Sequence, residues 1–165
     1  MLSVPSPSEY RPMKRERCSP VSSLLDLRSF HTASDVSVSD TAISRRTAMV
    51  WCVQNSKTYI VIELGRLVAG ESVPSTISIA YNVIKSHVSA SGDGPVHNGR
   101  YSMVGFGGVA VNAWNANNHQ LSWGVLSAAL TAVLDYMRIF GNGATTFNIF
   151  DGSNMVGQGT VNVPT

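Results

Sequence analysis

Loop histidine and aspartate residues are the first candidates for chemistry in this chain. General acid–base catalysis needs an imidazole within hydrogen-bond reach of a carboxylate that orients it. Asp93 and His97 lie in the turn-rich stretch SGDGPVHNG, residues 91–99, and Asp151 begins an Asp-Gly turn near the C-terminus. If the fold brings these three residues together, they form a candidate enzyme or ligand-binding site.

A tryptophan followed by asparagines is a second candidate, for binding rather than catalysis. The stretch NAWNANN places Trp114 directly before Asn115 and three positions before Asn117. An indole ring can stack on a sugar while amide groups hydrogen-bond its hydroxyls, so this pattern favours a carbohydrate site. Asparagine is also typical of turns and helix caps, which explains the same residues without a ligand. Both interpretations stay open.

A glycine-rich stretch, GFGGVA at residues 105–110, fits the loose dinucleotide pattern G-x-G-x-x-A. That site needs a helix N-terminus directly after the glycines to bind the pyrophosphate, whereas a β-branched stretch follows here. We therefore expect a β-bulge at Gly107 and Gly108 within one long strand, residues 101–114. The sequence contains no P-loop, no Cys or His pair at metal-ligand spacing and no G-x-S-x-G motif. No cofactor and no metal are predicted.

Charge is distributed unevenly along the 165 residues. Residues 1–47 carry seven Lys and Arg against five Asp and Glu, whereas residues 48–165 carry five of each. So few basic residues offer no stripe for a phosphate backbone, and we expect no nucleic-acid partner for the folded part. The sparse charge also indicates either a surface of neutral polar side chains or a homo-oligomer that buries surface.

The N-terminal segment, residues 1–47, is interpreted as a disordered tail or as a targeting or processed segment, because it holds four of the seven prolines and many serines. Arg28, two positions before Phe30, resembles the end of a mitochondrial presequence, but the acidic residues of the segment oppose import. We find no signal peptide, so secretion requires a processed or reassigned N-terminus. The compartment stays unknown. The two cysteines, Cys18 and Cys52, are interpreted as incidental thiols.

Two amphipathic helices organise residues 48–165. In residues 120–142, polar or glycine positions recur every three or four residues, which predicts a soluble helix that lies on a sheet rather than a transmembrane segment. Residues 72–91 repeat the pattern, with Ser72 as the expected N-cap and a proline in the first turn. Asn117 or Asn118 is the expected cap of the later helix.

Predicted strands precede, separate and follow these two helices in the sequence. A hairpin is expected from residues 48–53 and 58–67, and a second one turns at Asp151-Gly152. In the last strand, Gly157 and Gly159 share the predicted buried side. We expect the large helix side chain of Trp123 or Tyr136 to fill the hollow that they leave.

The order strand, strand, helix, strand, helix, strand, strand predicts an α+β two-layer sandwich, with a mostly antiparallel sheet and two helices packed on one face, in a single domain spanning residues 48–165. The element order over residues 72–163 and the Asn/Gly-rich character resemble the small fungal killer toxins with a two-helix α/β sandwich and the secreted effectors related to them. The resemblance implies a small secreted binding protein rich in disulfides. This chain departs from it in having two cysteines.

Three functional hypotheses follow. The first is a small non-enzymatic binding or interaction protein, effector- or toxin-like, with an unknown protein or carbohydrate partner. The second is a small enzyme or ligand-binding domain with its site near Asp93, His97 and Asp151. The third is a structural or oligomeric subunit whose low charge reflects buried interfaces.

Overall fold

The computed structural model describes residues 48–165 of the chain. The expectations for residues 1–47, namely the disordered or targeting segment, the presequence resemblance and the thiol of Cys18, lie outside the described residues.

The described chain contains six strands and two α-helices, joined by short loops and two 3-10 turns. In chain order the elements are β1 (Met49–Cys52), β2 (Thr58–Leu67), α1 (Ser72–Ser91), the 3-10 turn His97–Gly99, β3 (Arg100–Val104), the 3-10 turn Phe106–Gly108, β4 (Ala110–Asn115), α2 (Trp123–Phe140), β5 (Gly143–Asp151) and β6 (Asn154–Asn162).

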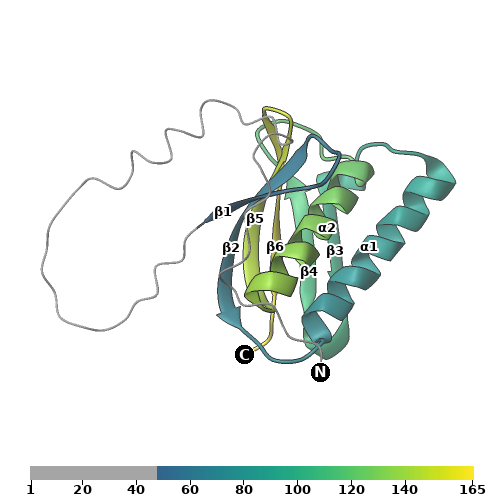
Figure 1. The fold of residues 1–165 in the computed structure, drawn as a ribbon. Coiled ribbons are helices and arrows are strands. Elements are labelled where there is room, and N and C mark those ends of the chain that lie inside the picture. The colour runs from purple at the N-terminus through teal and green to yellow at the C-terminus, as the bar shows by residue number, and fades with distance from the viewer. Residues whose placement is uncertain (1–47) are drawn as a thin grey trace, which may run out of the picture.

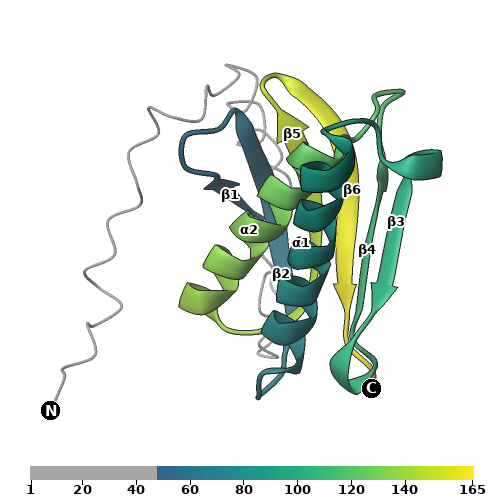
Figure 2. The ribbon, with the colours of Figure 1, turned by 90° about the vertical axis from the view of Figure 1, so that its right-hand side faces the viewer.

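The strands form a single six-stranded sheet in the order β1-β2-β5-β6-β4-β3, and all five neighbouring pairs are antiparallel. Both helices lie side by side on one face of this sheet (Figure 1), and the view turned by 90° shows the two layers (Figure 2). Helix α2 contacts β2 and β5, and α1 contacts β4. The predicted α+β two-layer sandwich is confirmed.

The core lies between the sheet and the helices. Ile62, Phe147, Gly159 and Ala113 face one another across four strands, and the three side chains other than glycine are at most 3% exposed. Leu130 of α2 is fully buried on the same side. Burial of one such aliphatic side chain stabilises a fold by about 1.5–3 kcal/mol, so the apolar faces of the two helices hold the layers together.

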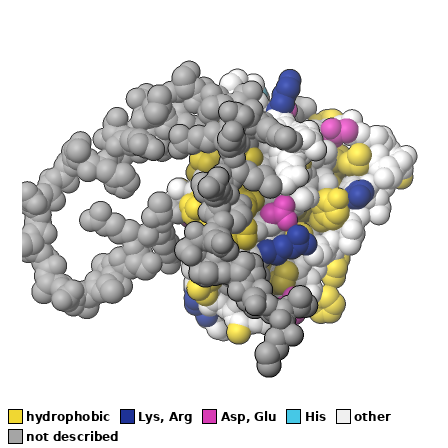
Figure 3. Space-filling model, in the orientation of Figure 1, with side chains coloured by type: hydrophobic (Ala, Val, Ile, Leu, Met, Phe, Trp, Pro, Cys, Tyr) yellow, Lys and Arg dark blue, Asp and Glu magenta, His cyan; other side chains and the backbone are white. Residues whose placement is uncertain are grey.

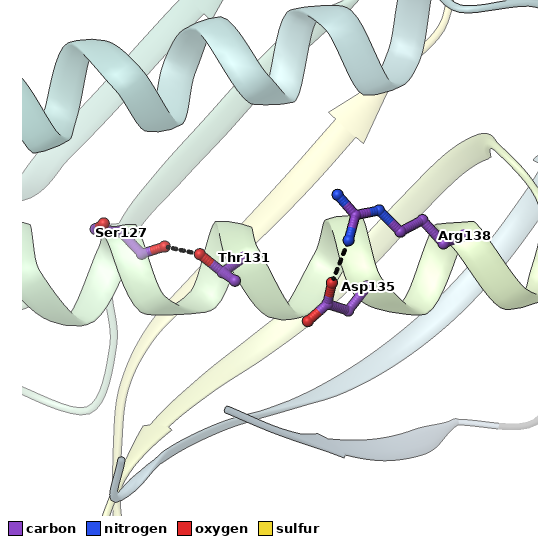
Figure 4. A network of polar contacts seen from close by, with 4 residues as sticks. All are labelled: Ser127, Thr131, Asp135 and Arg138. Atoms are coloured by element: carbon purple, nitrogen blue, oxygen red, sulfur yellow. Dashed lines mark hydrogen bonds and ion pairs between the residues drawn. The ribbon is translucent and has the colours of Figure 1, made fainter. Parts of the chain in front are cut away.

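Helix α2 presents a stripe of polar residues, Ser127, Thr131, Asp135 and Arg138, away from the core, as predicted. We call these residues the polar stripe. The Thr131 hydroxyl donates a hydrogen bond to the Ser127 carbonyl (3.2 Å), and Arg138 pairs with Asp135 (3.1 Å) (Figure 4). Both side chains of the ion pair are largely exposed, so it contributes little to stability.

The N-caps of the two helices differ from the prediction. The Ser122 hydroxyl caps α2 by accepting from the Val125 N–H (3.2 Å). Asn117 and Asn118 instead take left-handed φ angles of 53° and 59° in the preceding turn. The local sequence contains three residues that suit an N-cap, Asn117, Asn118 and Ser122, and the packing of the first helical turn on the sheet determines that Ser122 is the cap.

Ser72 is likewise not the N-cap of α1. It is the first helical residue, and the N-cap is Glu71, which makes no side-chain capping bond. The proline in the first turn was placed correctly, because α1 begins two residues before Pro74.

The expected long strand with a bulge is wrong. Residues 100–115 form two strands, β3 and β4, which pair with each other from Arg100↔Trp114 to Val104↔Ala110. Gly107 and Gly108 have φ angles of 62° and 74°, which reverse the chain in a tight turn. The irregularity at these two glycines is therefore a hairpin turn between two strands, not a bulge within one strand.

The hollow beside Gly157 and Gly159 exists, but different side chains fill it. The ring of Phe147, directly across from Gly159 on β5, occupies the space that a Cβ at Gly159 would need. Leu121 does the same at Gly157, with both Cδ atoms 3.2 Å from the Cβ position. The prediction of Trp123 or Tyr136 was wrong because cross-strand and loop neighbours lie closer than the helix layer.

Cys52 is not an incidental thiol. It is disulfide-bonded, and no free cysteine occurs in the described chain. Because Cys52 is the single cysteine of residues 48–165, its partner lies outside the described residues. This corrects the interpretation drawn from the low cysteine count.

Helix α2 is the one described helix long and apolar enough, by length and composition, to cross a membrane. Seven of its residues are buried in the sandwich, including Leu126, Leu130 and Val133. The described residues therefore contain no clear transmembrane segment.

Candidate functional site

All six predicted site residues lie toward the same end of the sheet. Asp151 at the end of β5 pairs with Thr58 at the start of β2, and Asn115 at the end of β4 pairs with Gly157 near the start of β6. Trp114 precedes Asn115, Asn117 follows it, and Asp93 and His97 belong to the loop that leads from α1 into β3. In Figure 1 this is the upper end.

Asp93 has a structural partner. Its Oδ1 accepts a hydrogen bond from the Gly124 N–H (2.8 Å), and its Oδ2 accepts one from the Ser122 hydroxyl (3.3 Å). The negative carboxylate therefore sits at the positive N-terminal end of α2, where the first amides lack helical partners. Asp93 ties the loop after α1 to the start of α2.

His97 and Asp151 are far apart. Asp151 ends β5 and His97 precedes β3, and the strands β6 and β4 lie between them in the sheet. Three strand spacings of ~4.8 Å separate the two strands by roughly 14 Å. An imidazole cannot be oriented by a carboxylate at that distance. The structure therefore does not bring Asp93, His97 and Asp151 together as one catalytic group.

Asn115 and Asn117 shape the loop between β4 and α2. The Asn115 Oδ1 accepts a hydrogen bond from the Leu121 N–H (2.9 Å). Its amide also packs against Gly99, where an added Cβ would lie 2.5 Å from Nδ2. Asn117 supplies a left-handed residue for the turn. These contacts favour the turn interpretation for both asparagines.

Trp114 differs from the asparagines that follow it, because it joins a row of polar side chains on the other face of the sheet. Its Nε1–H donates to Oε1 of Gln158 (3.1 Å), and Nε2 of Gln158 donates to Oδ1 of Asn148 (3.2 Å). The three residues are register partners on the adjacent strands β4, β6 and β5. All three are partly exposed. We call Trp114, Gln158 and Asn148 the amide row.

The amide row lies on the helix-free face of the sheet. Gly159, the neighbour of Gln158, is buried beneath the helices, and successive residues of a strand point to opposite faces. A second row of register partners runs beside it, and the Ser102 hydroxyl donates to Oδ1 of Asn112 (2.7 Å) within it. This row consists of Ser102, Asn112, Thr160 and Thr146. Hydroxyl and amide groups without charge therefore cover the middle of the face.

Sequence reasoning missed Gln158 and Asn148 as partners of Trp114. The predicted buried side of Gly157 and Gly159 does leave Gln158, which lies between them, on the opposite side of the strand, and its side chain is partly exposed. The register between β4, β6 and β5 depends on pairings between residues up to 44 positions apart. No local pattern encodes that register.

Burial affects the chemistry of three tyrosines among the described residues. Burial raises the pKa of Tyr59, Tyr101 and Tyr136 above the usual value of 10.0. The ring of Tyr101 lies edge-on to Trp123, with centroids 6.0 Å apart. These phenols are therefore neutral hydrogen-bonding groups at neutral pH.

The described surface offers little that resembles a metal or catalytic pocket. Within residues 48–165, no three His, Cys, Asp or Glu side chains gather as potential metal ligands. A shallow hollow lies on the outer surface of α1, and it contains none of the predicted site residues. Its lining residues are Asn82, Lys85, Ser86, Ser89 and Ala90.

Comparison of the chain with protein-family models, with curated proteins and with solved structures found no match. The candidate site therefore rests on the geometry of the helix-free face and its amide row.

Proposed function

We propose that this protein is a small non-enzymatic binding protein that contacts its partner through the helix-free face of the sheet. The single observation that carries the proposal is the amide row, in which one indole and two amides lie across three neighbouring strands. The residues Asp93, His97 and Asp151 support an enzyme less well, since the Asp93 carboxylate accepts a hydrogen bond from the Gly124 N–H at the N-terminus of α2.

A carbohydrate is the ligand class that suits this surface best. A sugar ring presents an apolar face to an indole and hydroxyls to neutral donors and acceptors. Trp114 offers the ring, and the amide and hydroxyl groups of both polar rows offer the hydrogen bonds. The two rows contain no Lys or Arg, which favours a neutral sugar, and among the described residues the one positive charge beside the amide row is Arg100 on β3, the register partner of Trp114. The proposal includes an effector- or toxin-like role, in which the protein acts by binding this carbohydrate.

The test is a binding screen of the full chain against neutral and acidic oligosaccharides. We expect neutral oligosaccharides to bind, and Trp114→Ala to weaken binding about tenfold, the equivalent of one lost aromatic contact. Gln158→Leu keeps the size of the side chain and removes its amide, so it should weaken binding with little effect on folding. Asn82→Ala, on the outer surface of α1, is the matched control and should bind like the wild type.

Two outcomes contradict the proposal. Absence of binding by any neutral oligosaccharide removes the carbohydrate as the ligand. Equal weakening by Asn82→Ala and Trp114→Ala removes the helix-free face as the binding surface, because the two residues lie on opposite sides of the sandwich.

A structural or oligomeric subunit is a second candidate, favoured by apolar side chains on the described surface. Val104 and Phe106 at the end of the edge strand β3 are 68% and 60% exposed. Figure 3 shows yellow apolar groups interspersed with charged groups over the helices. Light scattering of the purified chain separates the two candidates, since a concentration-dependent dimer that Phe106→Ser disrupts would favour the oligomer.

A further inference from the structure

We propose that two copies of this chain associate through the edge strand β3, which pairs antiparallel with β3 of the second copy about a two-fold axis at Ser102. The pairing joins the two six-stranded sheets into one continuous sheet. The proposal rests on the oligomer named above as the second candidate function, and it gives that oligomer a specific surface. It does not depend on a carbohydrate ligand.

The first step concerns the peptide groups of β3. Among the described residues, β4 is the one strand that pairs with β3, which lies at the outer edge of the sheet (Figure 2). The Gly105 N–H donates to the Val109 carbonyl (2.8 Å) and closes the hairpin of β3 and β4. Bonded and non-bonded pairs alternate along an antiparallel ladder, so every second residue of β3 bonds to β4. The residues whose peptide groups point outward are Arg100, Ser102 and Val104.

The second step is that the sequence of β3 does not block a further strand. Edge strands of soluble proteins often carry a proline, a bulge or an inward-pointing charge that prevents pairing with another chain. The stretch RYSMV contains no proline, and its register with β4 runs without a shift. Its one charged residue, Arg100, is exposed and lies at the end of the strand. The outer edge of β3 is therefore suited to strand addition.

The third step is that β3 complements itself when two copies run antiparallel, as an interface with two-fold symmetry requires. When Ser102 lies opposite Ser102 of the partner subunit, Tyr101 lies opposite Met103 of the partner subunit. A thioether beside an aromatic ring makes a favourable contact. Arg100 then lies opposite Val104 of the partner subunit, so the two positive charges are at opposite ends of the strand pair and do not repel each other directly.

The fourth step concerns the hydrogen bonds that this register allows. The Ser102 N–H donates to the Ser102 carbonyl of the partner subunit, and the Val104 N–H donates to the Arg100 carbonyl of the partner subunit. The Arg100 N–H already donates to the His97 carbonyl of its own chain, and the pairing leaves that bond intact. The outward N–H groups of Ser102 and Val104 therefore both gain an acceptor.

The fifth step is that exposed apolar side chains of α1 lie beside the same edge. Thr76 marks the side of α1 that faces β3, since an added Cβ at Gly105, which follows β3, would lie 2.6 Å from the Thr76 side chain. Ile79 and Val83 follow Thr76 at steps of three and four, so they lie on that side of the helix. They are 39% and 52% exposed. Together with the exposed apolar side chains at the end of β3, they form a surface that a second copy covers.

The size of this interface determines how tightly the copies associate. Stable, specific interfaces bury about 1,200–2,000 Å² in total. One pair of five-residue strands, flanked by a few apolar side chains, lies at the lower end of that range. We therefore expect a reversible dimer that dissociates on dilution.

The interface is tested by sedimentation equilibrium of the full chain over a range of concentrations. Val104→Lys places a positive charge opposite Arg100 of the partner subunit and should weaken the dimer at least tenfold. Val104→Glu places a negative charge there and should leave the dimer as tight as in the wild type or tighter. Val50→Lys, at an exposed valine of the other edge strand, β1, is the matched control and should associate like the wild type.

Three outcomes overturn the proposal. A wild-type chain that stays monomeric at every concentration removes both the dimer and the oligomer as a candidate function, and leaves an extended segment of another protein as the occupant of the edge. A dimer that Val104→Lys does not weaken removes β3 as the interface but keeps the oligomer. Equal weakening by Val104→Lys and Val104→Glu removes the antiparallel register.

The strand pairing itself is tested by hydrogen exchange, resolved by residue, at low and high protein concentration. The amides of Ser102 and Val104 should exchange severalfold more slowly at the high concentration, because they become hydrogen-bonded in the dimer. In Val104→Lys, the exchange of Ser102 should not change with concentration. Equal exchange of Ser102 at both concentrations in a wild-type chain that sediments as a dimer would overturn the proposal, since the copies would then meet through another surface.

Discussion

Asp93 and Gly124, 31 positions apart in the sequence, are joined by a 2.8 Å hydrogen bond from the Gly124 N–H to the Asp93 carboxylate. Beside it, the Trp123 N–H donates to the Gly94 carbonyl (3.0 Å) and the Val96 N–H donates to the Leu121 carbonyl (2.8 Å). These three bonds fasten the loop after α1 to the start of α2. Asp93, which the sequence offered as a carboxylate to orient a catalytic histidine, therefore joins the end of α1 to the start of α2.

Loss of the Asp93 side chain should destabilise the protein. Asp93→Ala leaves the Gly124 N–H without its partner, and removal of a cap of this kind costs about 1 kcal/mol. Urea denaturation measures the change. Asp135→Ala is the matched control, because its carboxylate is largely exposed on the outer side of α2, and it should shift the midpoint much less. Equal shifts in the two variants would contradict the capping role.

Replacement of Gly159 by a larger residue should overpack the core. In Gly159→Val the new side chain enters the space occupied by the Phe147 ring, and overpacking typically costs about 1–3 kcal/mol. Gly94→Ala is the control, since no atom lies within 4 Å of its Cβ position. The second change Phe147→Leu should recover part of the loss. If the two changes add without coupling, Phe147 is not the group that clashes.

The two faces of α2 should respond oppositely to substitution. Leu130 is fully buried, so Leu130→Asp places an unpaired carboxylate in the core and should abolish folding. Thr131 lies on the polar stripe, where its hydroxyl bonds to the carbonyl of Ser127 within the same helix, and Thr131→Leu should leave the fold intact. Circular dichroism compares the secondary structure of the two variants, and thermal melts compare their melting temperatures. Two variants that fold equally well would refute the orientation of α2.

Stability should fall at alkaline pH because of the buried tyrosines. Burial raises the pKa of Tyr59, Tyr101 and Tyr136 above 10.0 in the folded state, so the folded chain binds more protons than the unfolded chain above pH 10. The stability that the three raised pKa values contribute is present in full below pH 10 and is lost as pH rises through those values. Urea midpoints measured from neutral pH to above pH 10 should decline, and Tyr101→Phe should make the decline shallower. A flat profile would exclude this linkage.

Much of the fold could be predicted from local pattern. The polar stripe of α2 and the hairpin of β1 and β2 both follow from periodicity and turn chemistry, and the structure contains both of them. The details that were predicted wrongly depend on contacts with other parts of the fold. Three residues near the start of α2 suit an N-cap, and only the packing of the helix decides that Ser122 is the one. Gly107 and Gly108 suit a bulge and a turn, and only strand pairing decides between them.

The candidate site shows most clearly which features the sequence determines and which ones depend on the tertiary structure. By itself, the sequence determined that a two-layer sandwich forms, because hydrophobic period and turn residues are local properties that each segment carries alone. The tertiary structure alone decided that Asp93 caps a helix, that His97 and Asp151 stay apart, and that Trp114 meets Gln158 and Asn148. The physical reason is that strand order and register join residues distant in the chain, and no single segment encodes those pairings.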